Sequence, residues 1–309
     1  MTNRRYHDPL VLNPHTLFTS VGSCGSNQPE EVKKLQQMII NAGYQQATGR
    51  ELEINGKCDQ QTIEAIRWYQ RLLNLSPDGL VSPVDNGFIT ALKQMSPHQR
   101  QRHHGGPLHV RAGQITFDAE GHDYITAVAP FRAHKTPYFS RVLHWPGGST
   151  SGVTLGRGYD MGGRSRGEVY ATLRQAGIEE YKAVICSKAA GLKGNQARTF
   201  MQVYGPMVGE ISHRQQVKLF EIAYQKKLNE ARISYHRHTK NSTDAISWDN
   251  LDAKIRDIVV DIFYQSAHDV STLFSVVRKN DRQELASFIQ KDSLYMDYEK
   301  DRKRIGYLK

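Results

Sequence analysis

Residues 151–161 read SGVTLGRGYDM, a run in which β-branched and apolar residues are interrupted by glycines. Val153, Thr154 and Leu155 favour an extended strand, whereas glycines permit tight turns and a close approach of the backbone to another molecule. Further glycines lie on both sides of this run. The pattern predicts a small β-hairpin, with its core at residues 152–159, whose backbone comes close to a ligand.

The hairpin sequence and an upstream Glu-Gly pair resemble a known enzyme superfamily. Glu120-Gly121, followed by the Ser-Gly-Val-Thr-Leu-Gly-Arg-Gly-Tyr-Asp-Met run, is similar to the phage-type (T4-like) lysozymes, and most closely to their pesticin-like branch. The resemblance covers about residues 112–300. It implies a mainly α (α+β) fold, with a lysozyme-like helical domain that carries a small β-hairpin. It also implies that Glu120 is the catalytic acid and that Thr154 and Asp160 take part in catalysis.

The distribution of acidic residues supports Glu120 as the acid. Residues 126–159 contain neither Asp nor Glu, so an acid just ahead of the hairpin must come from one of three positions: Asp118, Glu120 or Asp123. Glu120 has the longest of the three side chains, and its apolar neighbours Phe117 and Ala119 could desolvate it and raise its pKa. We expect a short strand or extended run to end at Glu120, because apolar residues alternate at Val110, Ile115 and Phe117.

Cleavage of a β-1,4 glycosidic bond requires a protonated carboxylic acid that donates to the leaving oxygen. A second group must stabilise the oxocarbenium-like state or position water; Asp160 suits this role, and the Thr154 hydroxyl can orient water. Inversion would require about 6.5–9.5 Å between the carboxyls and retention about 5–5.5 Å, and both stay open. So do simpler roles: Asp160 as a cap, Thr154 as an ordinary strand residue and Glu120 as a surface charge.

Four further residues near the hairpin are candidates for substrate binding: Tyr138, Arg141, His144 and Tyr159. Aromatic rings stack on sugar faces, and an arginine can pair with the carboxylates of peptide stems. No cysteine or histidine set has the spacing of a metal site, so we expect neither a metal ion nor another cofactor.

The N-terminal part contains three amphipathic segments separated by two tight turns. Helices are predicted at residues 29–42, 59–73 and 87–95, and the turns at Asn55-Gly56 and Asp78-Gly79. This order resembles the three-helix peptidoglycan-binding-like module over about residues 30–95. A compact helical domain without affinity for glycan stays open as the alternative.

The C-terminal part is predicted to be largely helical. Helices are expected at residues 165–176 and 179–187, in a segment that starts at Ser212, and over residues 247–265. The last segment carries an apolar stripe that we interpret as core: Trp248, Leu251, Ile255, Ile258, Val259, Ile262 and Phe263. Asp59 and Ser212 are the predicted N-caps. The chain is thus divided into an extended arm (1–28), a peptidoglycan-binding-like domain (29–96), a linker (97–109) and a muramidase domain (110–309).

Composition narrows the class of protein. The 41 Lys and Arg against 31 Asp and Glu give a net charge of +10, which favours encounter with a polyanion. Basic residues are scattered among acidic ones and no nucleic-acid motif is present, so nucleic acid is not the expected partner. No stretch approaches the roughly 20 apolar residues of a membrane span, and the N-terminus does not resemble a secretory signal. The three cysteines suggest no disulfide framework.

These observations predict a peptidoglycan hydrolase, a muramidase that cleaves the bond between MurNAc and GlcNAc. The combination resembles type VI secretion effectors, which implies an antibacterial toxin made in the cytoplasm and acting in the periplasm or cell wall of a target bacterium. An immunity protein and a secretion-system spike protein are the implied partners besides peptidoglycan. A phage endolysin, a lytic transglycosylase and a non-catalytic wall-binding or delivery protein stay open as alternatives.

Overall fold

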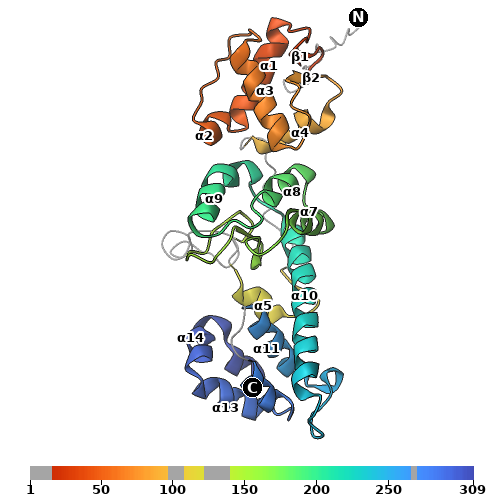
Figure 1. Ribbon diagram of the computed structural model, residues 1–309, viewed down its shortest axis with the longest axis vertical. Coiled ribbons are helices and arrows are strands. Elements are labelled where there is room, and N and C mark those ends of the chain that lie inside the picture. Colours follow the sequence, from red (N-terminus) through yellow and green to blue (C-terminus); the bar gives the residue numbers. More distant parts are fainter. Residues whose placement is uncertain (1–15, 97–107, 122–139, 266–269) are drawn as a thin grey trace, which may run out of the picture.

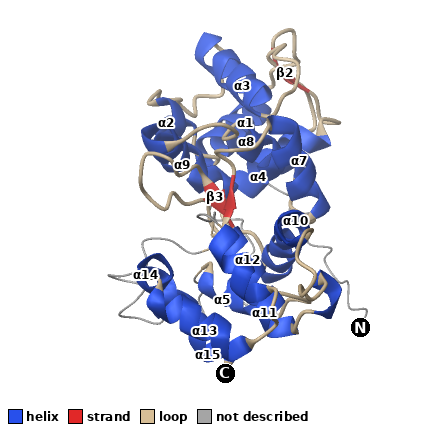
Figure 2. Ribbon diagram, turned by 60° about the horizontal axis from the view of Figure 1, so that its bottom comes forward, coloured by secondary structure: helices blue, strands red, loops and turns tan. Residues whose placement is uncertain are grey.

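The structure is a computed structural model that describes residues 16–96, 108–121, 140–265 and 270–309 of the chain. Over these residues it contains fourteen α-helices and two small two-stranded sheets. An N-terminal helical domain is followed by a longer helical domain (Figure 1), and strands form only a small part of the molecule (Figure 2). The predicted mainly α fold class, with a small β-hairpin, is therefore confirmed.

The N-terminal domain packs its helices around one apolar core. Its elements are β1 (Val21–Gly22), α1 (Pro29–Asn41), α2 (Tyr44–Thr48), α3 (Gln60–Leu72), β2 (Leu80–Val81) and α4 (Asn86–Met95). Helices α1, α3 and α4 lie where the sequence predicts helices, whereas the short α2 was not predicted. Asp59 caps α3 as expected, because its carboxylate accepts the N–H of Thr62 at 2.9 Å.

The segment just before α1 belongs to this domain rather than to an extended arm. Val21 pairs with Val81, and Gly22 with Leu80, in an antiparallel ladder. Gly22 has a φ of +123°, and a Cβ there would lie 2.0 Å from the carbonyl oxygen of Gly79. The glycine is what allows the two strands to approach, so residues 20–28 fold back onto the turn before β2.

Two buried glutamines fix the two predicted turns. Gln36 of α1 donates to the side chain of Asn55 at 3.0 Å and accepts the N–H of Gly56 at 3.0 Å. Gln70 of α3 accepts the N–H of Gly79 at 2.9 Å and donates to the carbonyl oxygen of Leu80 at 2.9 Å. A primary amide can donate and accept at once, so each glutamine satisfies a turn that would otherwise bury unpaired backbone groups.

The C-terminal domain has two lobes joined by α10 (His213–Thr239), a 27-residue helix about 40 Å long (Figure 1). The hairpin lobe holds β3 (Thr154–Leu155), β4 (Tyr159–Asp160), α7 (Arg166–Gln175), α8 (Glu180–Ser187) and α9 (Gly194–Val208). The helical lobe holds α5 (Gln114–Ala119), the 3-10 helix η2 (Trp248–Asn250), α11 (Ala253–Tyr264), α12 (Ser271–Val277), α13 (Arg282–Lys291), α14 (Ser293–Arg302) and α15 (Arg304–Leu308). Ser212 is the N-cap of α10, as predicted, and it forms a complete capping box with Gln215.

Two sequence predictions in this domain are wrong in detail. The alternating run before Glu120 forms the helix α5 and not a strand, because Gly113 adopts a left-handed conformation that starts a turn and Phe117 is buried against α10. Six residues are too few for alternation to exclude a helix. The apolar stripe over residues 247–265 is core, but Trp248 and Leu251 precede α11, which begins after the N-cap Asp252.

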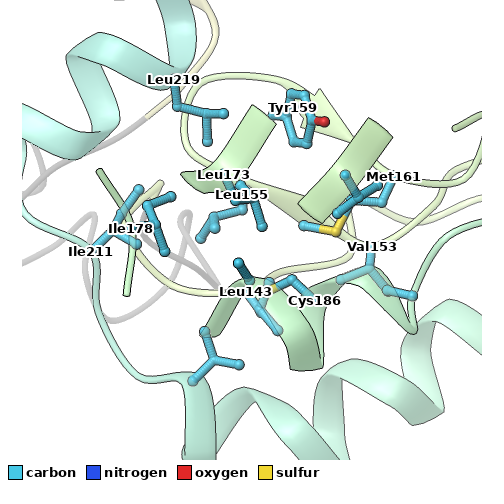
Figure 3. Close-up of a cluster of buried hydrophobic side chains, with 14 of the residues drawn as sticks. Leu143, Val153, Leu155, Tyr159, Met161, Leu173, Ile178, Cys186, Ile211 and Leu219 are labelled. Carbon is cyan, nitrogen blue, oxygen red and sulfur yellow. The ribbon is translucent and has the colours of Figure 1, made fainter. Parts of the chain in front are cut away.

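The predicted hairpin forms, and it is packed on a closed apolar core. Thr154 pairs with Asp160 and Leu155 with Tyr159 in an antiparallel register. Figure 3 shows hairpin side chains beside residues of α7, α8, α10 and the connecting segments: Leu143, Val153, Leu155, Tyr159, Met161, Leu173, Ile178, Cys186, Ile211 and Leu219. All ten are buried. The hairpin is therefore a rigid support for the residues that it carries.

The two domains contact each other through α9 and α8. Helices α2 and α4 pack against α9, and the Nζ of Lys188 donates to the side chain of Asn74 at 2.8 Å. Residues 97–107, which include most of the predicted linker, lie outside the described residues. In the part of the chain that the structure describes, no helix combines the length and apolar character that a membrane span needs.

Candidate functional site

Glu120 lies at the end of α5, where the helical lobe meets the hairpin. Its N–H still donates to the carbonyl oxygen of Thr116 at 3.0 Å, and its side chain is only 15% exposed. The helix is anchored by Phe117, whose buried ring stands edge-on to Phe220 of α10 with 5.1 Å between centroids. Glu120 therefore projects from a fixed point.

The Glu120 carboxylate is the end of a buried chain of charges. It accepts a hydrogen bond from Arg302 of α14, which also donates to Asp261 of α11 at 2.8 Å. The second oxygen of Asp261 accepts from Arg304 at 2.7 Å, and Arg304 also donates to Gln265 at 2.7 Å. Asp261 and Arg304 are fully buried. Two guanidinium groups are thus balanced by two carboxylates.

This environment changes the acidity of Glu120. Burial raises the pKa of Glu120 above its ordinary value, because the charged form loses its hydration. The Arg302 guanidinium opposes this effect, while the negative charge of Asp261 adds to it. The balance lies on the side of a raised pKa. A carboxyl group of this kind can hold a proton and deliver it to a leaving group.

The hairpin turn reaches Glu120 through a glycine. Gly158 has a φ of +78°, and a Cβ at this position would lie 2.6 Å from Oε2 of Glu120 and 2.8 Å from the ring of Tyr264. Tyr264 is held in place because its hydroxyl donates to the carbonyl oxygen of Arg157 at 2.8 Å. The guanidinium of Arg157 in turn donates to the carbonyl oxygen of Gly121 at 2.7 Å. These contacts lock the hairpin turn onto the end of α5.

Asp160 fixes the open end of the hairpin. One oxygen accepts the N–H of Gly152 at 3.0 Å, and the other accepts the N–H of Gly162 at 2.6 Å. Thr154 lies directly across the ladder from Asp160, is 4% exposed, and its hydroxyl donates to the carbonyl oxygen of Gly152 at 3.4 Å. The structure therefore brings Thr154 and Asp160 together, and both support the backbone of the hairpin.

A cleft of about 350 Å³ opens beside the hairpin, within the size range of small-ligand sites. Its lining residues come from the hairpin lobe, α10 and α11: Thr150, Gly158, Asp160, Gly163, Arg164, Glu168, Lys193, Ala223, Lys226, Lys227, Glu230 and Tyr264. Gly158 is the point at which this cleft meets Glu120. Asp160 thus lines the cleft, whereas Glu120 lies against Gly158 and is not itself among the lining residues.

The other predicted binding residues lie deeper. Arg141, His144 and Tyr159 are 0%, 4% and 1% exposed, so their side chains do not face a ligand in this conformation. Arg141 lies 3.6 Å from the carboxylate of Glu210, and Tyr159 stacks under the guanidinium of Arg164 at 4.4 Å. Their contacts lie within the protein and not in the cleft. Tyr138 lies outside the described residues.

The burial of His144 also changes the pKa of its ring. The backbone of His144 pairs with that of Thr154, which adds a bridge at the edge of the hairpin. Burial lowers the pKa of His144 to about 4, so the ring is neutral over the physiological range. A neutral ring avoids the free-energy cost of burying a charge.

The sequence interpretation missed the residues that hold Glu120: Tyr264, Asp261, Arg302 and Arg304. Asp261 carries a signal, since it is a lone carboxylate inside the apolar run VVDIF at residues 259–263. A charge at a core position predicts a buried cationic partner. The arginines carry no comparable signal, because they lie in a polar segment near the C-terminus.

Metal-ligating side chains do not gather at this site. Across residues 16–96, 108–121, 140–265 and 270–309, no three His, Cys, Asp or Glu side chains lie close enough together to hold a metal ion. Cys186 is buried, and burial raises the pKa of its thiol to about 12, so it stays protonated.

Two protein-family models match the chain, one in each domain. A model for a peptidoglycan binding domain matches residues 28–84. The chain therefore carries a peptidoglycan-binding domain, as predicted, which associates it with the cell wall. A search among curated proteins finds no match. A second family model, described as a domain of unknown function (DUF8812), matches residues 113–305, which include Glu120, the hairpin and Asp261. Because this match covers more than half of the chain, the protein belongs to the DUF8812 family.

Proposed function

We propose that this protein is a muramidase, which hydrolyses the β-1,4 bond between MurNAc and GlcNAc with Glu120 as its general acid. One observation carries the proposal: a buried glutamate with a raised pKa lies against Gly158, a glycine that lines a ligand-sized cleft together with Asp160. The peptidoglycan-binding domain at the other end of the chain supplies the substrate class. The sequence resemblance of the hairpin to phage-type lysozymes agrees with both.

In this mechanism, protonated Glu120 donates to the leaving glycosidic oxygen as the bond breaks. Asp160, whose carboxylate is fixed by two backbone N–H groups at the cleft, stabilises the positive charge that develops on the sugar or positions the attacking water. Thr154 contributes by holding the strand opposite Asp160, since its buried hydroxyl donates to the carbonyl oxygen of Gly152. We assign Arg302 a positioning role, because it holds Glu120 while Asp261 shares its charge.

The proposal also predicts a pH dependence. Glu120 acts as an acid only when protonated, so the rate should fall as pH rises through its pKa, which burial places above the ordinary value of a glutamate. The cell-wall association agrees with action in the periplasm of a target bacterium. Delivery as an antibacterial effector, with an immunity protein and a spike protein as partners, is part of the proposal. Expression of the chain with an added export signal should then cause lysis of a bacterial host.

The decisive experiment is clearing of purified peptidoglycan by the wild type, Glu120→Gln and the control Glu284→Gln. Glu284 of α13 pairs with Lys279 and its side chain is 41% exposed, and its replacement by Gln changes the net charge by the same amount as Glu120→Gln. We expect Glu120→Gln to lower the rate by about 10² to 10⁴-fold, since this is the contribution of a general acid. Glu284→Gln should clear like the wild type.

Mass spectrometry of the released fragments identifies the reaction. Products with a reducing MurNAc end indicate hydrolysis, whereas 1,6-anhydro ends would indicate a lytic transglycosylase and overturn the muramidase assignment. Full activity in folded Glu120→Gln would move the acid to another carboxyl group. If the folded wild type binds peptidoglycan but releases nothing, the protein is a binding or delivery protein.

Asp160→Asn and Thr154→Val test the hairpin residues. The asparagine amide cannot accept both N–H groups, so Asp160→Asn should lower both activity and the midpoint of thermal unfolding. Thr154→Val keeps the β-branched shape, and a loss of rate without a change in unfolding would support a role in orienting water. An active Asp160→Asn variant would limit that residue to a structural role.

A further inference from the structure

Helix α8 is buried around its whole circumference. Seven of its eight residues, from Tyr181 to Ser187, are buried. A helix that is covered on every side needs packing partners on more than one face. One partner is the apolar core under the hairpin, in which Cys186 lies (Figure 3). The rest of the helix must be covered by another part of the molecule.

The N-terminal domain supplies part of this second cover. The hydroxyl of Tyr181, a residue that is only 7% exposed, donates to the carbonyl oxygen of Gln94 in α4 at 3.4 Å. Lys188, which follows the last residue of α8, donates to the side chain of Asn74 at 2.8 Å. The same short helix therefore contacts the hairpin core and the peptidoglycan-binding domain.

Helix α9 connects the hairpin with the N-terminal domain along its length. At its first residue, the N–H of Gly194 donates to the carbonyl oxygen of Ser151, just ahead of the hairpin, at 2.9 Å. Near its last residue, Met207 is 2% exposed, and a Cβ on Gly43 would lie 3.7 Å from the methyl carbon of Met207. Helices α2 and α4 both pack against α9. One end of α9 is thus fixed to the hairpin and the other to the N-terminal domain.

The hairpin end of α9 reaches the backbone that holds Asp160. Lys193, the residue before α9, forms an antiparallel bridge with Gly152. The N–H of Gly152 donates to the carboxylate of Asp160 at 3.0 Å. Lys193 and Asp160 both line the cleft beside the hairpin. A displacement of α9 would therefore change the support of Asp160 and the wall of the cleft.

The contact between the two domains is not closely packed throughout. A groove of about 360 Å³ remains between them, with the end of α1, the start of α2 and Met95 of α4 on one side and Val203, Pro206 and Met207 of α9 on the other. None of its lining residues is charged. Atoms that line a void lose packing contacts, so this contact is weaker than the packing inside either core.

We propose that α8 and α9 couple the peptidoglycan-binding domain to the hairpin, so that docking of this domain controls the order of the hairpin and of the cleft beside it. The domain then acts on the cleft as well as on attachment to the wall. The proposal depends on packing between the domains, and it holds whether or not Glu120 is a catalytic acid.

The test measures amide hydrogen exchange of the full chain in the wild type and in Met95→Lys. Met95 is 1% exposed and lines the groove, so a lysine there should undock the N-terminal domain without changing any residue of the hairpin lobe. The amides to follow are those of Thr154 and Met161, which donate to backbone carbonyl oxygens at 2.8 and 2.9 Å. We expect their exchange to rise about ten- to a hundredfold, the effect of exposing one methionine side chain.

Two further variants complete the experiment. Val84→Lys introduces the same charge at a position of the same domain that is 79% exposed, so its exchange should match that of the wild type. Met95→Ala removes side-chain volume without burying a charge and should give a smaller increase at the same amides. Protection of α1 and α3 shows whether the N-terminal domain is folded. If Met95→Lys unfolds this domain, Met95→Ala provides the comparison.

Two results would overturn the proposal. One is exchange that increases in α8 and α9 but stays at the wild-type level in the hairpin, which would make the N-terminal domain a tether only. The other is unchanged exchange in α8, α9 and the hairpin, which would show that docking contributes nothing to this lobe. Hydrogen exchange does not depend on catalysis, so failure here and failure of the muramidase proposal are distinguishable.

Discussion

The two domains solve the same problem, a polar group inside a core, with different chemistry. The N-terminal domain uses neutral amides: Gln36 and Gln70 are 0% and 5% exposed, and each satisfies a turn within the domain. The C-terminal domain uses charges: Asp261 and Arg304 are fully buried, and the chain of ion pairs continues to Glu120. A neutral amide costs less to desolvate than an ion. The charged network is therefore the more costly of the two ways to bury a polar group.

The two domains should respond differently to substitution of their buried polar groups. A satisfied amide contributes locally, so its removal loosens one turn. A buried ion network is cooperative, because each charge depends on its partner for its stability in a low-dielectric interior. Removal of one partner leaves the other charged and desolvated. Substitutions should therefore destabilise the protein most at the buried ions, less at the buried amides and least at an exposed ion pair.

The largest effect is expected for Asp261→Asn. This change leaves Arg304 fully buried without a carboxylate partner and weakens the hold on Arg302, so we expect about 3–5 kcal/mol of destabilisation. Urea unfolding of the full chain, with hydrogen exchange to locate the change in the helical lobe, measures it. Asp249→Asn is the matched control, because Asp249 pairs with Arg232 at 3.4 Å and its side chain is 70% exposed. Equal effects of the two variants would contradict the importance of burial.

His144 should make the hairpin lobe sensitive to acid. Its folded pKa of about 4 lies below its ordinary value of 6.5, so between these values the unfolded state binds more protons and folding loses stability as pH falls. The loss should total about 3 kcal/mol by pH 4. The comparison is thermal unfolding of wild type and His144→Gln from pH 7 to pH 4. A constant difference between them across this range would show that His144 does not titrate as its burial requires.

Gln36→Leu and Gln70→Leu test the neutral design. Each variant leaves one turn N–H, of Gly56 or Gly79, buried without its acceptor, so we expect a loss of about 1–3 kcal/mol. Hydrogen exchange should increase at that turn and in the helices that flank it, while the helical lobe is unaffected. A loss as large as that of Asp261→Asn would remove the distinction between amides and ions.

The parts of the molecule that could be predicted from the sequence are those that depend on neighbouring residues in the chain. Asp59 and Ser212 were identified as caps because capping depends on residues three positions apart. The hairpin at residues 152–159 was identified because glycines and β-branched residues determine it locally. Glu120 was chosen as the candidate acid from a short motif and the absence of other carboxylates, and that role stays a prediction. These features all depend on neighbours in the chain.

The support of Glu120 could not be predicted in the same way. Arg302 contacts Glu120 from 182 positions away, and nothing in the sequence around either residue indicates the pairing. Arg141 was expected at the ligand surface, but the fold buries it completely. α5 was expected to be extended, since six residues with alternating apolar character fit both structures. Contacts between distant elements decide all three, and local pattern contains no information about them.

The smallest effect is expected where charges pair at the surface. Lys226 of α10 donates to Glu168 of α7 at 2.9 Å, but the two side chains are 56% and 34% exposed. The pair with Lys226 lowers the pKa of Glu168, so it stabilises the fold above the ordinary pKa of 4.5 and is lost as pH falls through the lower folded value. Solvent screening limits this contribution, and we expect Lys226→Gln to cost less than about 1 kcal/mol.

Salt separates this exposed pair from the buried network. At about 1 M salt the Debye length is about 3 Å, so the difference between wild type and Lys226→Gln should vanish, whereas the effect of Asp261→Asn should persist because ions do not reach a buried pair. Urea unfolding of both variants at low and high salt makes this comparison. If salt also removed the effect of Asp261→Asn, the network behind Glu120 would be open to solvent, and burial could not be what raises the pKa of the proposed acid.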